Sequence, residues 1–160
     1  MISRFAKKED ITNISQFRVF SLVSEHGLPL DEASFVEQNT AEYLKNELGK
    51  TCFISLAEDD QEIVSIAFLC IFYRLPSNKH PTGKYAQLYG VFTSPDYRGN
   101  GYAKDCVSLL LKQAESLDID AVALNSTEAA QNMYERLGFE HARTLPALVK
   151  KYDYNKGVKK

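Results

Sequence analysis

Residues 87–103 of this chain read QLYGVFTSPDYRGNGYA, and this is the most informative stretch of the sequence. Its first half is rich in residues that favour β-strands and belongs to a strand predicted from Tyr85 to Thr93. Pro95 then marks a turn, and a glycine-containing loop leads into a helix whose apolar residues recur at three- and four-residue spacing from Ala103. The pattern predicts a strand, a tight loop and the start of an amphipathic helix.

The loop that opens this helix has the chemistry of an anion site. The first backbone N–H groups of a helix have no acceptor within it, and the helix dipole places about half a positive charge there. Small residues at Gly99, Gly101 and Ala103 let a bulky anion approach the backbone, and Arg98 adds a cation at the rim. The sequence therefore predicts that a phosphate or pyrophosphate binds here.

Two well-known phosphate motifs do not fit the loop. A Walker P-loop requires GxxxxGK[ST], whereas Lys104 follows Ala103 and precedes Asp105. A dinucleotide fingerprint requires GxGxxG, and Lys104 occupies its third glycine position. A turn that merely starts a helix would explain Gly99 and Gly101, but it would not explain the sequence downstream.

A second motif follows at residues 130–139, which read AQNMYERLGF. Together with Arg98-Gly99-Asn100-Gly101-Tyr102-Ala103, it resembles the GNAT acetyltransferase superfamily. That family binds acetyl-CoA through Arg or Gln, two residues, Gly, one residue, then Gly or Ala. Its second signature is Ala-x-x-x-Tyr-x-x-x-Gly-Phe. The resemblance is close over residues 85–140 and extends more loosely over the whole chain, and the two motifs together make it strong.

The predicted elements follow the order of that family's α/β fold. The order is βααβββαβαββ, with strands at 3–6, 51–57, 63–73, 85–93, 119–124 and from 139 through 154, and with helices at 11–26, 31–48, 103–117 and 128–137. We expect the second helix to bury Phe35, Val36, Tyr43 and Leu44. The resemblance implies a mixed central sheet with an antiparallel first half, flanked by helices, whose fourth and fifth strands splay into a V.

The resemblance also implies how acetyl-CoA is held. The pantetheine arm would lie in the V, on backbone groups of Val91, Phe92 and Thr93, and one N–H of that strand would polarise the thioester carbonyl. The pyrophosphate would lie on the N–H groups of Arg98, Gly99, Asn100, Gly101, Tyr102 and Ala103. Residues 91–93 are equally typical of an ordinary core strand, and side-chain identity tests a backbone prediction poorly.

Tyr134 aligns with the family's tyrosine, which protonates the departing thiolate. A phenol with a pKa of about 10 can supply a proton to a thiol with a pKa of about 8.5. On periodicity alone, Tyr134 would be a core residue of an amphipathic helix. Many family members carry an asparagine seven residues before this tyrosine, where this chain has Thr127, with Asn125 two residues earlier. Either residue could contact the pantetheine, or the cluster could cap the following helix, and both interpretations stay open.

The acceptor side has no comparable motif. An amine with a pKa of about 10.4 must lose a proton before it attacks, and a carboxylate or histidine usually assists. The candidate bases are Glu25, His26, Glu37, Tyr89 and Glu128. The charged ones are each also typical of a solvated surface. Arg18 lies in an otherwise apolar stripe, so it either extends to water or binds an acidic group of the acceptor. Arg18 and Tyr89 are the candidate substrate residues.

Length and composition limit the function classes. The chain has 160 residues, of which 44% are hydrophobic and 25% charged, with a net charge of −2, which is typical of one globular domain over residues 1–160. The charge argues against nucleic-acid binding, and no apolar segment suits a membrane span or signal peptide, so we expect a cytoplasmic protein. The three cysteines form no CxxC pair and are expected to be buried, reduced thiols. The isolated histidines indicate no metal site.

The sequence thus predicts an N-acetyltransferase that moves the acetyl group of acetyl-CoA to a primary amine by direct attack in a ternary complex. A small-molecule amine is favoured, because the chain is close to one minimal domain without an added peptide-binding module. One alternative is a protein acetyltransferase that acts on a lysine or N-terminal amine. Another is a non-catalytic acyl-CoA sensor. Edges of such sheets often pair into homodimers, and the oligomeric state stays open, as does the identity of the acceptor.

Overall fold

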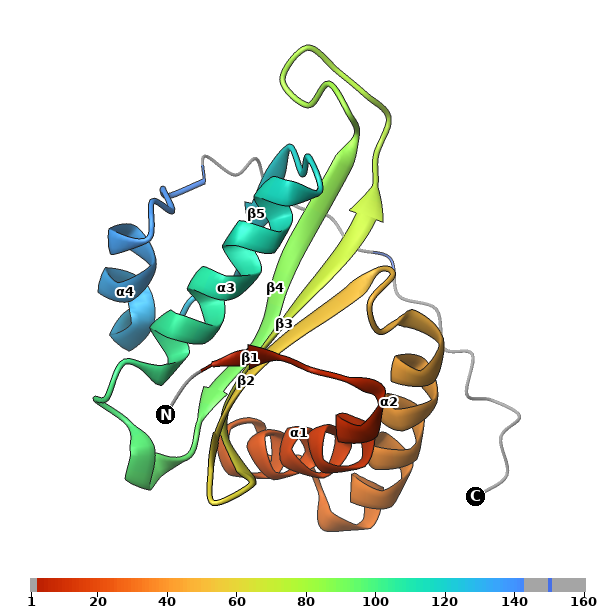
Figure 1. Cartoon of the computed structure of the whole chain (residues 1–160), viewed down its shortest axis with the longest axis vertical. Helices are drawn as coiled ribbons and strands as arrows, with labels where there is room; N and C mark the ends of the chain where they lie inside the picture. The colour runs from red at the N-terminus through yellow and green to blue at the C-terminus, as the bar shows by residue number, and fades with distance from the viewer. Residues whose placement is uncertain (1–2, 143–149, 151–160) are drawn as a thin grey trace.

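The structure of this chain is a computed structural model that describes residues 3–142 and residue 150. Its strands are β1 (Arg4–Phe5), β2 (Cys52–Asp59), β3 (Glu62–Tyr73), β4 (Lys84–Thr93) and β5 (Ala121–Ala123) (Figure 1). Its α-helices are α1 (Ile11–His26), α2 (Ala33–Glu47), α3 (Tyr102–Ser116) and α4 (Gln131–Arg136). Single 3-10 turns precede them: η1 (Lys8–Asp10), η2 (Leu30–Glu32), η3 (Pro95–Tyr97) and η4 (Glu128–Ala130).

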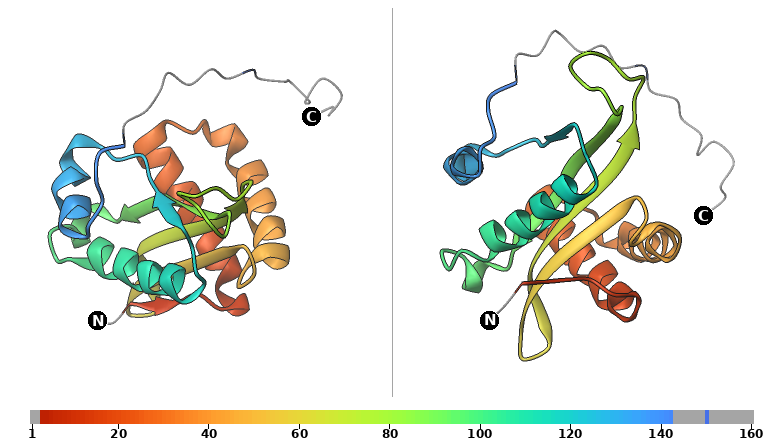
Figure 2. Two further views of the ribbon diagram at one scale, coloured as in Figure 1. Left: turned by 90° about the horizontal axis from the view of Figure 1, so that it is seen from above. Right: turned by 45° about the horizontal axis from the view of Figure 1, so that its top comes forward.

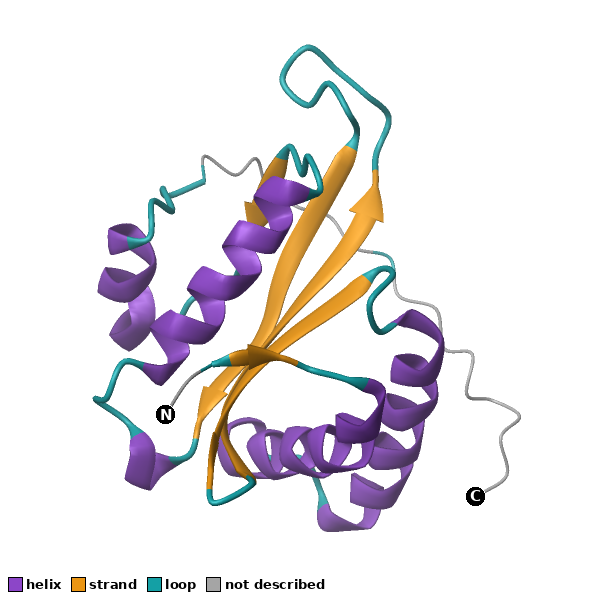
Figure 3. Ribbon diagram, viewed as in Figure 1, coloured by secondary structure: helices purple, strands orange, loops and turns teal. Residues whose placement is uncertain are grey.

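The five strands form one mixed sheet in the order β1-β2-β3-β4-β5 (Figure 3). Strands β1 to β4 pair antiparallel, and β5 pairs parallel to β4. A parallel neighbour needs a crossover connection, which α3 supplies between β4 and β5. The sheet confirms the predicted α/β class with its antiparallel first half.

Helices cover both faces of the sheet. Figures 1 and 2 show α3 and α4 on one face and α1 and α2 on the other. The face under α3 and α4 buries a cluster that includes Leu69, Leu88 and Leu110. The opposite face buries a second cluster that includes Ile14 and Leu44. Removal of apolar surface from water on both faces stabilises this three-layer arrangement.

Strand β4 contains a one-residue bulge near its C-terminal end. Ile66 of β3 pairs with Phe92, but Phe68 pairs with Tyr89, so three steps along β4 match two steps along β3. Gly90, within the bulge, has a φ of +52°, which glycine adopts at little cost. The bulge moves Phe92 to the α1 and α2 face, although the residue four positions before it packs under α3.

Strands β4 and β5 separate after a short paired segment. Only Tyr85, Ala86 and Gln87 of β4 pair with β5, which ends at Ala123. From residue 88 to Thr93, β4 pairs with β3 alone among the described strands. The predicted splay is therefore present, and within residues 3–142 it leaves one edge of β4 without a partner strand.

The expectation that α2 buries four apolar residues is wrong for two of them. Phe35 is 59% exposed and Tyr43 is 45% exposed, whereas Leu44 is buried. Helix α2 packs mainly against α1 rather than the sheet, so only a narrow stripe of it is covered. Helical spacing gives the direction of a side chain but not the width of the contact.

The strand predicted to begin at Phe139 does not begin there. Residues 139–142 form no strand, because the Phe139 N–H donates to the Tyr134 carbonyl at 3.1 Å and completes the turn that ends α4. The remainder of that prediction, over 143–149 and 151–154, lies outside the described residues. In the part of the chain that the structure describes, no helix is long and apolar enough to cross a membrane.

Candidate functional site

Hydrogen bonds within the loop, and one to the end of β2, hold the segment between β4 and α3. The Tyr97 N–H donates to the Ser94 carbonyl at 2.9 Å, and the Tyr97 hydroxyl donates to Asp59 Oδ2 at 2.9 Å. Asn100 Nδ2 donates back to the Tyr97 carbonyl at 3.1 Å. These bonds fix the backbone before α3 begins, so the groups that follow are already in place for a ligand.

The six backbone N–H groups of residues 99–104 have no acceptor among the described residues. Within residues 3–142, the N–H groups of residues 99–104 donate no hydrogen bond, and the first to do so is that of Asp105, to the Gly101 carbonyl at 3.0 Å. Gly99 and Gly101 have φ values of +80° and +85°, and a Cβ at either would meet no atom within 4 Å. Open donors at the positive end of a 15-residue helix suit an anion.

Arg98 is bound by α1, a contact that the sequence did not predict. Its Nη2 lies 2.6 Å from Glu25 Oε1, and its Nε donates to the Thr93 carbonyl at 3.1 Å. Its guanidinium carbon lies 5.8 Å from the centre of the Phe92 ring. Both side chains of the ion pair are about half exposed, so water screens their attraction. The cation at the rim of the loop therefore links the loop to the other layer of helices.

Val91, Phe92 and Thr93 lie in the segment of β4 that no described strand pairs with on the β5 side. Val91 packs against the core under α3, and Phe92 packs against two aromatic rings of α1. The Thr93 hydroxyl shares a hydrogen bond of 2.8 Å with the Ser65 hydroxyl. Packing occupies these side chains, which leaves the backbone as the group that can contact a ligand.

Tyr134 of α4 is 7% exposed. Its ring packs edge-on against Phe139, with 5.7 Å between the ring centres. Burial raises the pKa of the Tyr134 hydroxyl above its ordinary value, because the apolar surroundings disfavour the phenolate. The hydroxyl therefore keeps its proton at neutral pH, as a proton donor must.

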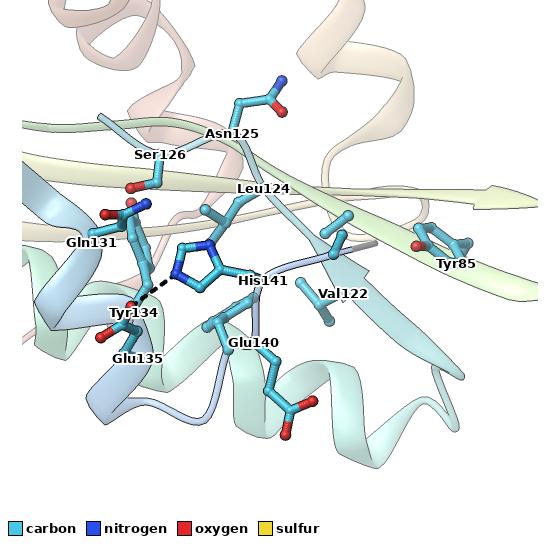
Figure 4. A pocket seen from close by; sticks show the side chains of 13 residues that line it. Tyr85, Val122, Leu124, Asn125, Ser126, Gln131, Tyr134, Glu135, Glu140 and His141 are labelled. Carbon is cyan, nitrogen blue, oxygen red and sulfur yellow. Dashed lines mark hydrogen bonds and ion pairs between the residues drawn. The ribbon is translucent and has the colours of Figure 1, made fainter. Parts of the chain in front are cut away.

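A cavity of about 360 Å³ lies between β5, α4 and residues 139–142 (Figure 4). Tyr134 and Asn125 both line it, so the structure brings these two predicted residues together. In Figure 4 the Tyr134 ring extends from α4 toward Ser126, which follows the end of β5. The cavity thus combines a buried phenol with polar groups from the end of the strand.

Thr127 is exposed and does not line that cavity. It occupies the capping position of η4, where its carbonyl accepts the Ala130 N–H at 3.1 Å, but its side chain makes no capping hydrogen bond. The structure therefore does not support side-chain capping by Thr127. Contact of Thr127 or Asn125 with a cofactor stays a prediction.

Arg18 and Tyr89, the candidate substrate residues, share the face that α1 and α2 cover. The Arg18 guanidinium carbon lies 5.5 Å from the centre of the Phe68 ring, and its Nη1 would lie 3.1 Å from a Cβ at Gly90. Phe68 is directly opposite Tyr89, which is 50% exposed, so both point to this face. Within residues 3–142, Arg18 makes no ion pair. Arg18 and Tyr89 therefore lie near the bulge on the same face of the sheet.

Sequence reasoning also missed a side-chain contact beside Tyr134. His141 Nε2 lies 3.1 Å from Glu135 Oε1, and both residues line the cavity beside Tyr134. The two residues are separated by the turn that ends α4, so no helical spacing connects them. Among the candidate bases, Glu25 is paired with Arg98 and His26 is exposed. The described residues contain no group of three His, Cys, Asp or Glu that could hold a metal ion.

Comparison with known proteins identifies the family. A sequence model described as the Acetyltransferase (GNAT) family matches residues 18–139. The chain therefore belongs to the GNAT family of acetyltransferases. No curated protein sequence matches the chain.

Solved structures of low sequence identity share the fold. A predicted acetyltransferase with acetyl-CoA from Clostridium acetobutylicum is 22% identical, with a TM-score of 0.80 and with 92% of this chain and 94% of that chain covered. Glucosamine-6-phosphate N-acetyltransferase from Arabidopsis thaliana is 17% identical, with a TM-score of 0.72 and coverage of 96% and 100%. Ribosomal-protein-alanine N-acetyltransferase from Brucella melitensis biovar Abortus 2308 is 16% identical, with a TM-score of 0.65 and coverage of 94% and 100%.

Proposed function

We propose that this protein transfers the acetyl group of acetyl-CoA to a primary amine of a small molecule, which attacks the thioester while both substrates are bound. The observation that carries the proposal is the run of six N–H groups, at residues 99–104, that no described protein group accepts. Membership of the acetyltransferase family supports acetyl transfer. A structure of the same fold contains acetyl-CoA, which supports this cofactor.

The residues of the loop and of β4 fit acetyl-CoA. A pyrophosphate needs several donors and a close approach, and the loop offers both where a Cβ at Gly99 or Gly101 would meet no atom. Arg98, Gly99, Asn100, Gly101, Tyr102 and Ala103 would hold the pyrophosphate. The backbone of Val91, Phe92 and Thr93 would hold the pantetheine arm. When bound, acetyl-CoA supplies an acetyl group that is activated as a thioester.

Tyr134 would donate its proton to the thiolate sulfur that leaves. Its buried hydroxyl is protonated at neutral pH, and this supports the assignment. Asn125 lines the same cavity as Tyr134, which supports Asn125 rather than Thr127 as the polar contact for pantetheine. A buried place on α4 is also typical of a tyrosine that only packs in the core. The proposed role therefore rests on the protonated hydroxyl as well as on the location of the ring.

Arg18 supports an acceptor that carries an anionic group beside its amine. Its guanidinium lies between the Phe68 ring and Gly90, without a carboxylate partner in residues 3–142. A half-buried cation against backbone favours a compact acceptor over an extended peptide. The fold alone does not distinguish a small-molecule acceptor from a peptide. Two proteins that share it are a glucosamine-6-phosphate N-acetyltransferase and a ribosomal-protein-alanine N-acetyltransferase.

The test is an acceptor screen that follows free thiol release from acetyl-CoA. The panel contains amino acids, amino-sugar phosphates, polyamines, aminoglycosides and peptides. We expect turnover with small amines that carry an acidic group. Turnover with peptides alone would contradict the small-molecule assignment, and acetyl-CoA binding without any turnover would favour a sensor. A cytoplasmic location and a homodimer stay predictions from the sequence.

A further inference from the structure

Two cysteines face each other across the β2 and β3 pair. Cys52 is directly opposite Cys70 in the strand register, and their Sγ atoms lie 3.9 Å apart. One position along, the Ile71 N–H donates to the Thr51 carbonyl at 2.7 Å, so these opposite residues form a hydrogen-bonded pair. Because hydrogen-bonded and non-hydrogen-bonded pairs alternate in an antiparallel ladder, Cys52 and Cys70 are a non-hydrogen-bonded pair.

This pairing suits a disulfide bond. The Cα atoms of a non-hydrogen-bonded antiparallel pair are about 4.5 Å apart, within the range of about 4.4–6.8 Å found in disulfides. The paired strands already hold the two residues at this separation, so side-chain rotation is the main movement that bond formation needs. Both thiols are free in the structure.

The two thiols differ in access and in acidity. Cys70 is half-buried, whereas the sequence predicted burial, and Cys52 is fully buried. Hydrogen bonding with the Cys52 thiol, then with the Tyr43 hydroxyl, and the charge of Arg18 lower the pKa of Cys70. The pKa of Cys52 is raised by its hydrogen bond with Cys70 and by burial. Exposure and acidity therefore both favour Cys70 as the sulfur that reacts first, with Cys52 as the neighbouring thiol that can react second.

Cys106 has a different environment and provides an internal control. It belongs to α3 and is fully buried on the side of that helix that faces the sheet, and its Sγ lies 3.7 Å from the Ser3 hydroxyl. Burial raises its pKa, which disfavours the reactive thiolate. Neither of the other two cysteines lies beside it, because it packs on the opposite face of the sheet from Cys52.

We propose that Cys70 and Cys52 form a dithiol site that is oxidised by small disulfides through thiol–disulfide exchange. The Cys70 thiolate attacks one sulfur of the small disulfide, which breaks the S–S bond and releases one thiolate. The Cys52 thiolate then attacks the Cys70 sulfur, forms the Cys52–Cys70 bond and releases the second thiolate. The two protons of the protein thiols end on the two released thiolates, so the protein loses two electrons and the small disulfide gains them. This proposal does not depend on acetyl transfer.

The experiment treats the full chain with oxidised glutathione, alkylates the remaining thiols after denaturation, and measures the intact mass. We expect the protein to lose two hydrogens and to accept one alkyl group, with peptide mapping that assigns the alkyl group to Cys106 and the disulfide to Cys52–Cys70. Reduction before alkylation should restore three alkylated cysteines.

Variants separate the two steps. In Cys52→Ala the reaction should stop with one glutathione on Cys70, and in Cys70→Ser the protein should take up no glutathione. Cys106→Ser should behave as the wild type does, because it lies outside the pair. Three alkylatable thiols in the treated wild type would overturn the proposal, as would a stable glutathione adduct there, and neither result depends on whether a variant folds.

Discussion

The loop at residues 98–104 and the sheet face around Arg18 differ in what they present to a ligand. The loop presents backbone N–H groups at the start of α3, from residues that are consecutive in sequence. The face presents side chains from α1, β3 and β4, which lie far apart in sequence. We propose that the loop binds the cofactor and that the side chains around Arg18 select the acceptor. Substitutions in each region test whether the two functions are separate.

The largest effect is expected for Tyr134→Phe, which removes only the hydroxyl. Loss of a general acid should lower turnover by about 100-fold, while the acetyl-CoA affinity stays within about twofold of wild type. The measurement is thiol release under saturation, paired with calorimetric titration of acetyl-CoA. Unchanged turnover would assign Tyr134 to the core alone.

The pH profile gives a second test of Tyr134. Burial disfavours the phenolate and so raises the pKa of this hydroxyl above about 10, the value of an exposed tyrosine. Its acid form therefore persists through the range in which the acceptor amine loses its proton. Wild-type turnover should rise with pH, and it should show no decrease at any pH lower than about 10. A fall at lower pH in the wild type that Tyr134→Phe abolishes would contradict the shift.

Gly101→Ala should weaken acetyl-CoA binding by about tenfold, because a residue with a Cβ in the left-handed region costs about 1–2 kcal/mol and displaces the N–H groups around it. Gly49→Ala is the matched control, since Gly49 has a φ of +79° and open space but lies after α2. Calorimetric affinities of both variants make the comparison. Equal weakening in the two variants would show a general loss of stability and not a local binding site.

Arg18→Gln should raise the KM for an acidic acceptor by about tenfold, the effect of one lost charge-assisted hydrogen bond of about 1.5 kcal/mol. Acetyl-CoA affinity should not change. Arg74→Gln removes the same charge from a guanidinium that stacks 4.0 Å from the Tyr85 ring, beyond the end of β3, and is the control. An altered acetyl-CoA affinity in Arg18→Gln would break the division between the two regions.

The smallest effect is expected for Glu25→Gln, which joins the two regions through Arg98. The exposed ion pair competes with an anion for the guanidinium, so its removal should tighten acetyl-CoA binding by less than about fivefold at low salt. Glu42→Gln, which breaks the exposed pair with Lys45, should have no effect. Weaker binding in Glu25→Gln would mean that the pair supports the loop instead.

The same contrast explains how much the sequence could predict. Strand, loop and helix signals between residues 85 and 117 are local, and the structure contains each of them. The Arg98 and Glu25 pair and the Cys52 and Cys70 pair both join residues that are distant in sequence, so local sequence spacing does not predict either contact. Exposure of Tyr43 depends on how α2 sits on α1, which helical periodicity does not contain.

The bulge in β4 is an intermediate case. Gly90 in a strand pattern is a known sign of a bulge, yet the sequence does not show which face each neighbour then takes. That change of face moves Phe92 under α1 and leaves Gly90 open to Arg18. The placement of the candidate acceptor residues therefore depends on tertiary pairing and could not be derived from motifs.

The most direct test is a titration of the ¹⁵N-labelled protein with acetyl-CoA, in which NMR spectra record the amide N–H resonances at each step. We expect the resonances of residues 99–104 to shift most and to gain protection from solvent exchange, because their N–H groups acquire the pyrophosphate as an acceptor. Saturating acetyl-CoA that leaves these six resonances unchanged, while others shift, would contradict this expectation.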